Sequence, residues 1–194
     1  MDLLRNTVYC ILLAALLISS AECTTLQVSS HLQSAIDAAS RGDTLEVAAG
    51  VYEKIAVDKS INLIGNGAVI RAGGRDACVD ISADNVTISG FLVERGFYGI
   101  KLDHVQGCHI SNNTVIYSAQ PGIALLYSDG NIISGNNASF NGIVGEGWYG
   151  IYLSNSNHNL ISDNEAYGNG AYGINLFPSC RNNTITGNRL QGNM

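Results

Sequence analysis

The sequence has little charge, little proline and almost no tryptophan. Of its 194 residues, 13% are charged, the formal net charge is −6, and there are two Pro and one Trp. A protein that binds nucleic acid carries clustered Lys and Arg on its surface. The sequence therefore predicts no nucleic-acid partner.

Patterns of metal-ligating residues are also missing. No Cys-x-x-Cys spacing occurs, so we predict no metal and no other cofactor. The four histidines are scattered along the chain: His31, His104, His109 and His158. Four cysteines fall at different positions of the repeat described below, so we expect buried free thiols rather than disulfides: Cys23, Cys78, Cys108 and Cys180.

Long hydrophobic runs are absent apart from one near the N-terminus. Val8 to Ile18 carries no charge, follows Arg5 and precedes Ser19-Ser20-Ala21. Because a membrane span needs about 20 apolar residues, this run is too short to be one. The pattern is typical of a cleaved signal peptide. We predict a signal peptide over residues 1–21 and a secreted or cell-surface domain over 22–194.

What the sequence does have is a repeat. Ile-Ser/Thr-x recurs from Ile88 onward at intervals of 22, 23, 28 and 24 residues, and Gly-Ile-x-Leu recurs in phase with it from Gly99. Such periods are typical of stacked solenoids. Within each unit, apolar residues alternate in short runs bounded by Gly, Asn and Ser, which indicates strands rather than helices. We predict an all-β fold, a right-handed parallel β-helix of about six coils that is regular over 85–194.

Stacked coils place equivalent residues about 4.8 Å apart, so like residues should form ladders. Asn tolerates the left-handed conformation of a coil corner, and its amide can bond the amide of the next coil. One ladder is predicted at Asn113, Asn136, Asn164 and Asn188. A second is predicted at Ser118, Asn141, Asn169 and Asn193.

The two ends of the solenoid differ. Residues 31–40 follow Ser30 and place apolar residues on one helical face, which predicts a helix that caps the open strand edge of the first coil. After Asn188 the chain continues only to Met194, and the sequence offers no second cap. We expect end-to-end self-association through the last coil, a partner that covers it, or a truncated gene product.

Several segments resemble a known superfamily. Ala35 to Thr44, followed by Gly50-Val51-Tyr52-Glu53 and Lys59 to Gly65, resembles the opening of the right-handed parallel β-helix proteins of the NosD-like and pectate-lyase-like superfamily. The repeats extend this resemblance over residues 31–193. The superfamily is similar in architecture to carbohydrate-binding and sugar-hydrolysing surface proteins, so the resemblance implies a polysaccharide-related or cell-surface role.

Catalytic motifs of the related enzymes are not found. The hydrolases carry an Asp-Asp pair and a Gly-His-Gly segment, and neither string occurs in this sequence. Asp103-His104 is the one suggestive acid–base doublet, and a solvated coil corner explains it more simply. We predict no catalytic residue. Whether the chain is an enzyme stays open, and the sequence favours a non-enzyme.

The candidate binding site lies beside the Gly-Ile-x-Leu repeats. An outward-facing column is predicted at Lys101, Ala124, Tyr152 and Asn175. The longest repeat adds an insertion that ends in the only tryptophan, and insertions in solenoids map to loops that often bind ligands. Aromatic rings can stack on sugars, so we predict that Trp148, Tyr152 and Glu146 bind a glycan or polysaccharide. The alternative is that Trp148 packs over its own loop.

The sequence is compatible with three classes of function. The first is a non-enzymatic surface β-helix that binds glycan or serves as a structural module. The second is a polysaccharide lyase, hydrolase or epimerase, which a pair of carboxylates about 5 to 10 Å apart would favour. The third is a NosD-like accessory protein for copper delivery, which a cluster of metal ligands would favour.

Overall fold

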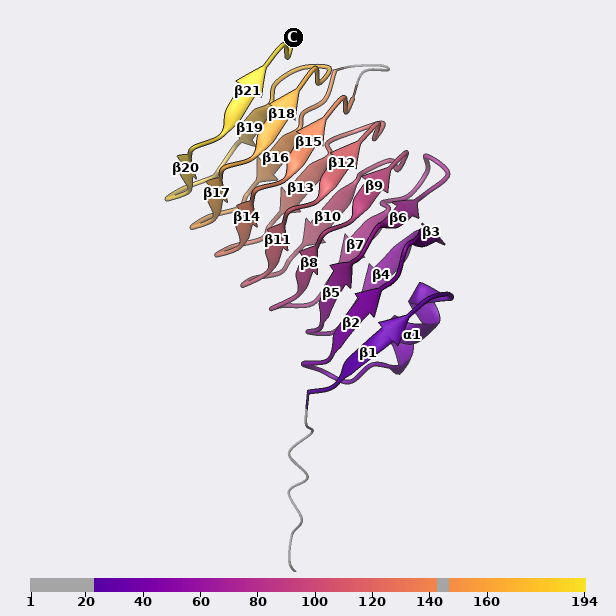
Figure 1. Ribbon diagram of the computed structural model, residues 1–194. Coiled ribbons are helices and arrows are strands. Elements are labelled where there is room, and N and C mark those ends of the chain that lie inside the picture. The colour runs from indigo at the N-terminus through magenta and orange to yellow at the C-terminus, as the bar shows by residue number, and fades with distance from the viewer. Residues whose placement is uncertain (1–22, 143–146) are drawn as a thin grey trace, which may run out of the picture.

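The computed structural model describes residues 23–142 and 147–194. These residues form a right-handed parallel β-helix in which three sheets run along the coil stack (Figure 1). The predicted all-β fold is confirmed, with about seven turns where about six were expected. The predicted signal peptide, residues 1–21, lies outside the described residues.

From β2 onward, successive strands fall in turn on sheets A, B and C, and all neighbouring strands are parallel. The first coil contributes only β1, and the last contributes only β20 and β21. Sheet A contains β1 (Thr25–Val28), β2 (Thr44–Val47), β5 (Asn62–Gly65), β8 (Thr87–Ser89), β11 (His109–Ser111), β14 (Ile132–Ser134), β17 (Leu160–Ser162) and β20 (Thr184–Thr186). Sheet B contains β3 (Gly50–Glu53), β6 (Ala68–Arg71), β9 (Leu92–Glu94), β12 (Thr114–Ile116), β15 (Asn137–Ser139), β18 (Glu165–Tyr167) and β21 (Arg189–Gln191). Sheet C contains β4 (Ile55–Val57), β7 (Val79–Ile81), β10 (Ile100–Asp103), β13 (Ile123–Leu126), β16 (Ile151–Ser154) and β19 (Ile174–Phe177).

The repeated isoleucines form the core. Ile88, Ile110 and Ile133 pair in register along sheet A, and Ile100 pairs with Ile123 along sheet C. All five side chains are fully buried. Because side chains alternate between the two faces of a strand, the residues between these anchors face outward. The period of the sequence thus decides which residues are available to a ligand.

The first predicted ladder is present inside the coils, and the second is present in part. In the first, Asn113 Nδ2 donates to Asn136 Oδ1 at 3.1 Å, and Asn136 Nδ2 donates to Asn164 Oδ1 at 3.0 Å. In the second, Asn141 Oδ1 accepts from Ser118 N at 3.0 Å and Asn169 Nδ2 donates to Asn193 Oδ1 at 2.9 Å, but the Ser118 hydroxyl has no hydrogen-bond partner among the described residues.

We expected the ladder asparagines themselves to adopt the left-handed conformation, and this expectation is wrong. The residue with positive φ is the one before the ladder residue, as at Asn112 (54°) before Asn113. A further ladder that the sequence reading missed contains Asn131, Asn159 and Asn183.

The second ladder explains the glycines of the Gly-Ile-x-Leu repeat. A Cβ atom on Gly122 would lie 2.6 Å from Asn141 Nδ2, and one on Gly150 would lie 2.9 Å from Asn169 Nδ2. Each ladder amide therefore occupies the space that a side chain at the glycine would need. The two features of the repeat depend on each other.

One helix, α1 (Leu32–Ala38), caps the N-terminal end, within the predicted range 31–40. Its Leu32 and Ile36 side chains are buried in the core. The Gln33 side chain accepts from Ala56 N at 2.8 Å and donates to Ala56 O at 3.1 Å, so it satisfies the edge of β4. The N-cap is His31, which has φ 49° and makes no side-chain cap hydrogen bond. No described helix is long enough to cross a bilayer.

At the other end, β19, β20 and β21 are the last strands of their sheets. Leu176, Phe177, Ile185 and Leu190 are exposed there. End-to-end self-association stays a prediction.

The expectation of buried free thiols holds for two of the four described cysteines. All four described cysteines are free, and Cys78 and Cys108 are buried as expected. Cys23 is exposed and Cys180 is half-buried, so burial was wrongly expected for these two. Cys23 lies just before the first strand of sheet A, and Cys180 lies in the turn between β19 and β20, near the end of the stack.

Candidate functional site

The outer face of sheet C carries the predicted column. The strand register aligns Lys101 with Ala124, Ala124 with Tyr152, and Tyr152 with Asn175, which confirms the expected alignment. Asp80 extends the column by one coil beside Lys101. Ala124 is fully buried although its position faces outward, so larger neighbouring side chains cover it.

Four aromatic side chains gather at the C-terminal half of this column. The Tyr149 ring lies 5.3 Å from Tyr152 and 6.0 Å from Tyr172 between ring centroids, and both pairs are stacked. Trp148 meets Tyr149 edge to face at 5.8 Å. We call these four residues the aromatic face: Trp148, Tyr149, Tyr152 and Tyr172. Tyr172 is 60% exposed and the other three are half-buried.

The structure therefore brings Trp148 and Tyr152 into one cluster, through Tyr149. Trp148 contacts its neighbour Tyr149 edge to face, and whether it also packs over its own loop depends on residues outside the described ranges. Glu146 lies outside the described residues. The sequence reading missed Tyr149 and Tyr172, although both directly precede a Gly-Ile-x-Leu motif.

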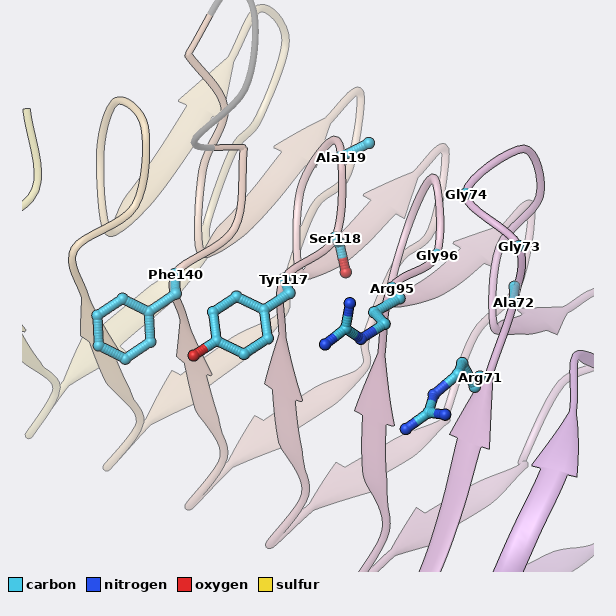
Figure 2. A pocket seen from close by; sticks show the side chains of 10 residues that line it. All are labelled: Arg71, Ala72, Gly73, Gly74, Arg95, Gly96, Tyr117, Ser118, Ala119 and Phe140. Atoms are coloured by element: carbon cyan, nitrogen blue, oxygen red, sulfur yellow. The ribbon is translucent and has the colours of Figure 1, made fainter.

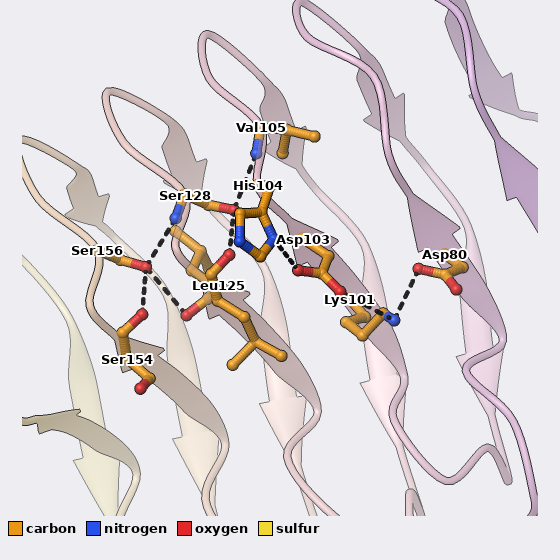
Figure 3. A network of polar contacts seen from close by, with 10 residues as sticks. Asp80, Lys101, Asp103, His104, Val105, Leu125, Ser128, Ser154 and Ser156 are labelled. Carbon is orange, nitrogen blue, oxygen red and sulfur yellow. Dashed lines mark hydrogen bonds and ion pairs between the residues drawn. The ribbon is translucent and has the colours of Figure 1, made fainter.

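The N-terminal half of the column is charged. Lys101 Nζ lies 3.2 Å from Asp80 Oδ1 and 3.5 Å from Asp103 Oδ2, and His104 Nδ1 lies 2.6 Å from Asp103 Oδ1 (Figure 3). Burial of the Lys101 ammonium opposes its charge, but its hydrogen bonds and ion pairs with the two aspartates outweigh this and raise the pKa of Lys101. Burial also raises the pKa of the nearby Tyr98 phenol.

This charged network has the form of a structural ion pair. Asp80 and Asp103 both hold the same ammonium group, whereas hydrolysis of a glycoside needs one carboxyl group as an acid and the other as a base or nucleophile. His104 is 71% exposed at a corner with φ 56° and stacks on Tyr127 at 4.8 Å. The doublet Asp103-His104 thus occupies the solvated corner that the simpler explanation expected.

A cavity of about 440 Å³ adjoins the charged end of the column. Lys54, Phe97, Tyr98 and Lys101 are among the residues that line it. The outer face of sheet C is therefore a continuous surface, with charge and a hollow at one end and stacked rings at the other.

The described residues do not fit a metal centre. In the ranges 23–142 and 147–194, no group of three or more His, Cys, Asp or Glu side chains is arranged to hold an ion. Asp103 and His104 contact each other, but Lys101 occupies the other side of the Asp103 carboxylate.

Several known proteins are similar to this chain. A cell surface glycoprotein of Methanothermus fervidus is 40% identical over 96 residues, which cover 47% of this chain and 16% of the relative. The chain thus spans less than a fifth of the length of that curated relative. An alginate lyase from Paenibacillus sp. is 18% identical with a TM-score of 0.64, covering 84% of this chain and 76% of that one. ORF18 of Geobacillus virus E2 is 19% identical with a TM-score of 0.68, and the match covers 80% of this chain and 37% of that one.

At these identities, the two solved structures show the fold alone. The family assignment rests on the sequence itself, because residues 36–194 match the profile of NosD, described as periplasmic copper-binding protein. That match covers most of the chain and includes every coil from α1 onward, so the chain belongs to the NosD family.

Proposed function

We propose that this protein is a non-enzymatic β-helix of the cell surface that binds glycan through the outer face of sheet C. The observation that carries the proposal is the aromatic face, in which Tyr149 stacks on Tyr152 of its own coil and on Tyr172 of the next coil. Rings from successive coils make a platform wider than one side chain. Such a platform suits a saccharide, whose rings carry C–H groups on their faces and hydroxyl groups at their edges.

Polar groups flank the rings, as ligand sites require for orientation. Asn175 follows Tyr152 in the same column, and Lys101 precedes it by two coils. Amide and ammonium groups can hydrogen-bond sugar hydroxyls on either side of the rings. Because the coils repeat at about 4.8 Å, a chain of sugars can follow the column along the solenoid.

Location at the cell surface is supported by the similarity to a cell surface glycoprotein and by the description of the NosD family as periplasmic. Both descriptions concern proteins of the cell envelope, and the signal peptide predicted over residues 1–21 agrees with such a location. The use of the protein as a structural module is compatible with the same location and needs no ligand.

Two other functions have less support. An enzymatic role needs free acid and base groups, and Asp80 and Asp103 are instead joined through Lys101. A role in copper delivery follows from the family description, but the described residues do not form a metal site. Neither function is carried by an observation on this chain.

A glycan array probed with the purified protein tests the proposal, together with an assay for new reducing ends. We expect binding to at least one glycan class without its cleavage. Tyr149→Ala should weaken that binding by at least about tenfold, because truncating a central aromatic residue of an interface costs about 2 kcal/mol or more. Tyr167→Ala, a matched change on sheet B, should have no effect. Binding that survives Tyr149→Ala, or cleavage of the glycan, would refute the proposal.

A further inference from the structure

A second surface with binding character lies where the strands of sheet B end. Three successive coils place a bulky side chain at this corner, and each of these residues has a left-handed backbone: Arg95 (φ 63°), Tyr117 (57°) and Phe140 (57°). We call them the corner row. The next two coils have Gly168 and Gly192 at the equivalent position, with φ 54° and 61°.

The left-handed conformation is strained for a residue with a Cβ atom and free of strain for glycine. The corners of sheet A follow this rule, since their positive-φ residues are Gly, Asn, Asp or His, as at Gly107, Gly130 and Asn112. Tyr127, at the end of sheet C, is a single bulky exception. Only the end of sheet B, within the described residues, uses three large side chains in succession.

Strained backbone persists where function requires it, so the corner row calls for an explanation beyond folding. Full burial does not offset the strain, because Tyr117 remains 50% exposed and Phe140 remains 44% exposed. Their rings are stacked at 6.0 Å between centroids, and Figure 2 shows them side by side along the coil stack. They form an aromatic platform separate from the aromatic face on sheet C.

A groove with a volume of about 520 Å³ runs along this row. Two arginines and no acidic residue are among the described residues that line it (Figure 2). Arg71 is occupied, because it donates to the buried Glu94 carboxylate through Nε at 2.9 Å and also through Nη2. Arg95 forms a longer ion pair with the same carboxylate, with Nε 3.9 Å from Glu94 Oε2 and so beyond hydrogen-bonding distance. Its side chain is 64% exposed, and the two arginines share the single negative charge of Glu94.

The groove thus offers one guanidinium group for an anion, next to two flat rings. We propose that it binds one residue of an anionic saccharide, a sugar that carries a carboxylate or a sulfate. The sugar ring lies on Tyr117 and Phe140, and its anionic group pairs with Arg95. A guanidinium group can hold either anion through two parallel hydrogen bonds. One surplus positive charge suits a single substituent and not a polyanion.

The test uses the whole protein and three hexasaccharides in calorimetric titrations. Chondroitin carries carboxylates, chondroitin sulfate carries sulfates as well, and chitohexaose is neutral. We expect at least one charged probe to bind, more weakly as salt is raised, and chitohexaose to bind at least tenfold more weakly. Binding of chondroitin identifies the carboxylate as sufficient, and binding of chondroitin sulfate alone identifies the sulfate.

Glycine substitutions separate binding from folding. Arg95→Gly and Tyr117→Gly each introduce the residue that later coils already have, so the thermal midpoint should stay equal or rise. Each should weaken binding of the charged probe by at least tenfold. Arg189→Gln is the matched control, because Arg189 lies over the Tyr167 ring at 5.6 Å on the same sheet but outside the groove.

Three results would overturn the proposal: neither charged probe binds, chitohexaose binds as tightly as they do, or the two glycine variants keep wild-type affinity. Trp148→Ala on sheet C should leave this binding unchanged. Failure of the corner groove is therefore distinguishable from failure of the aromatic face.

Discussion

The Asn ladder should make a large contribution to stability, and Asn136→Ala measures it. Asn136 Oδ1 accepts from Asn113 N at 3.0 Å, and Asn136 Nδ2 donates to Ile110 O at 2.8 Å. Removal of the side chain leaves this N–H and this carbonyl without these partners. Both lie in the interior, where Asn136 itself is 1% exposed, so water cannot easily replace the amide.

Each buried polar group that loses its partner costs about 1 to 3 kcal/mol. With two such groups, we expect Asn136→Ala to lower the free energy of unfolding by about 2 to 6 kcal/mol. A domain of this kind is stable by only about 5 to 15 kcal/mol, so the loss is a large fraction of the total.

Urea denaturation followed by circular dichroism measures this loss. Asn175→Ala is the matched control, because Asn175 faces outward on β19 and a surface change should stay within about 0.5 kcal/mol. A loss below about 1 kcal/mol for Asn136→Ala would mean that the ladder is not a main source of stability.

Three further predictions concern the ladder glycine Gly122, the ion pairs of Lys101 and the buried thiol of Cys78. Gly122→Ala should lower the urea midpoint, because the new Cβ would lie 2.6 Å from Asn141 Nδ2, and an unchanged midpoint would show that the coils can shift at no cost. Because the pKa of Lys101 is raised in the folded state, its ion pairs stabilise the fold fully below the ordinary pKa of 10.5. This stabilisation is lost as the pH rises through the folded pKa. The free energy of unfolding, measured above about pH 10.5, should therefore fall more steeply in the wild type than in Lys101→Gln. Burial raises the pKa of the Cys78 thiol to about 11, so iodoacetamide at neutral pH should alkylate the exposed Cys23 and spare Cys78, as peptide mass spectrometry would detect, and equal labelling would contradict the described burial.

The coil architecture could be predicted because stacking repeats the same physical requirement in every turn. A buried isoleucine in one coil needs an apolar neighbour in the next, and each amide of the second ladder needs a glycine beside it, as Gly122 gives Asn141. The ladder through Asn131 could also have been found, since Asn131 and Asn159 each precede a repeat isoleucine by two residues. In the coil before Asn131 the equivalent residue is Cys108, so the Asn repeat begins one coil later and is harder to recognise in the sequence.

The binding surfaces were less predictable because they depend on where side chains point. Trp148 and Tyr152 were found from the long repeat, but their link through Tyr149 requires ring positions that no spacing reveals. The corner row was hidden for another reason. Glycine and asparagine mark a left-handed corner in a sequence, whereas Arg95 and Tyr117 give no such sign.

Fluorescence of Trp148 tests the central claim most directly, because it is the only tryptophan of the chain and belongs to the aromatic face. Titration with the glycan identified on the array should change its emission along a saturating curve. The dissociation constant from that curve should match the calorimetric value, and Tyr149→Ala should shift both together. If calorimetry shows binding while the emission of Trp148 stays constant, the glycan does not bind at the aromatic face.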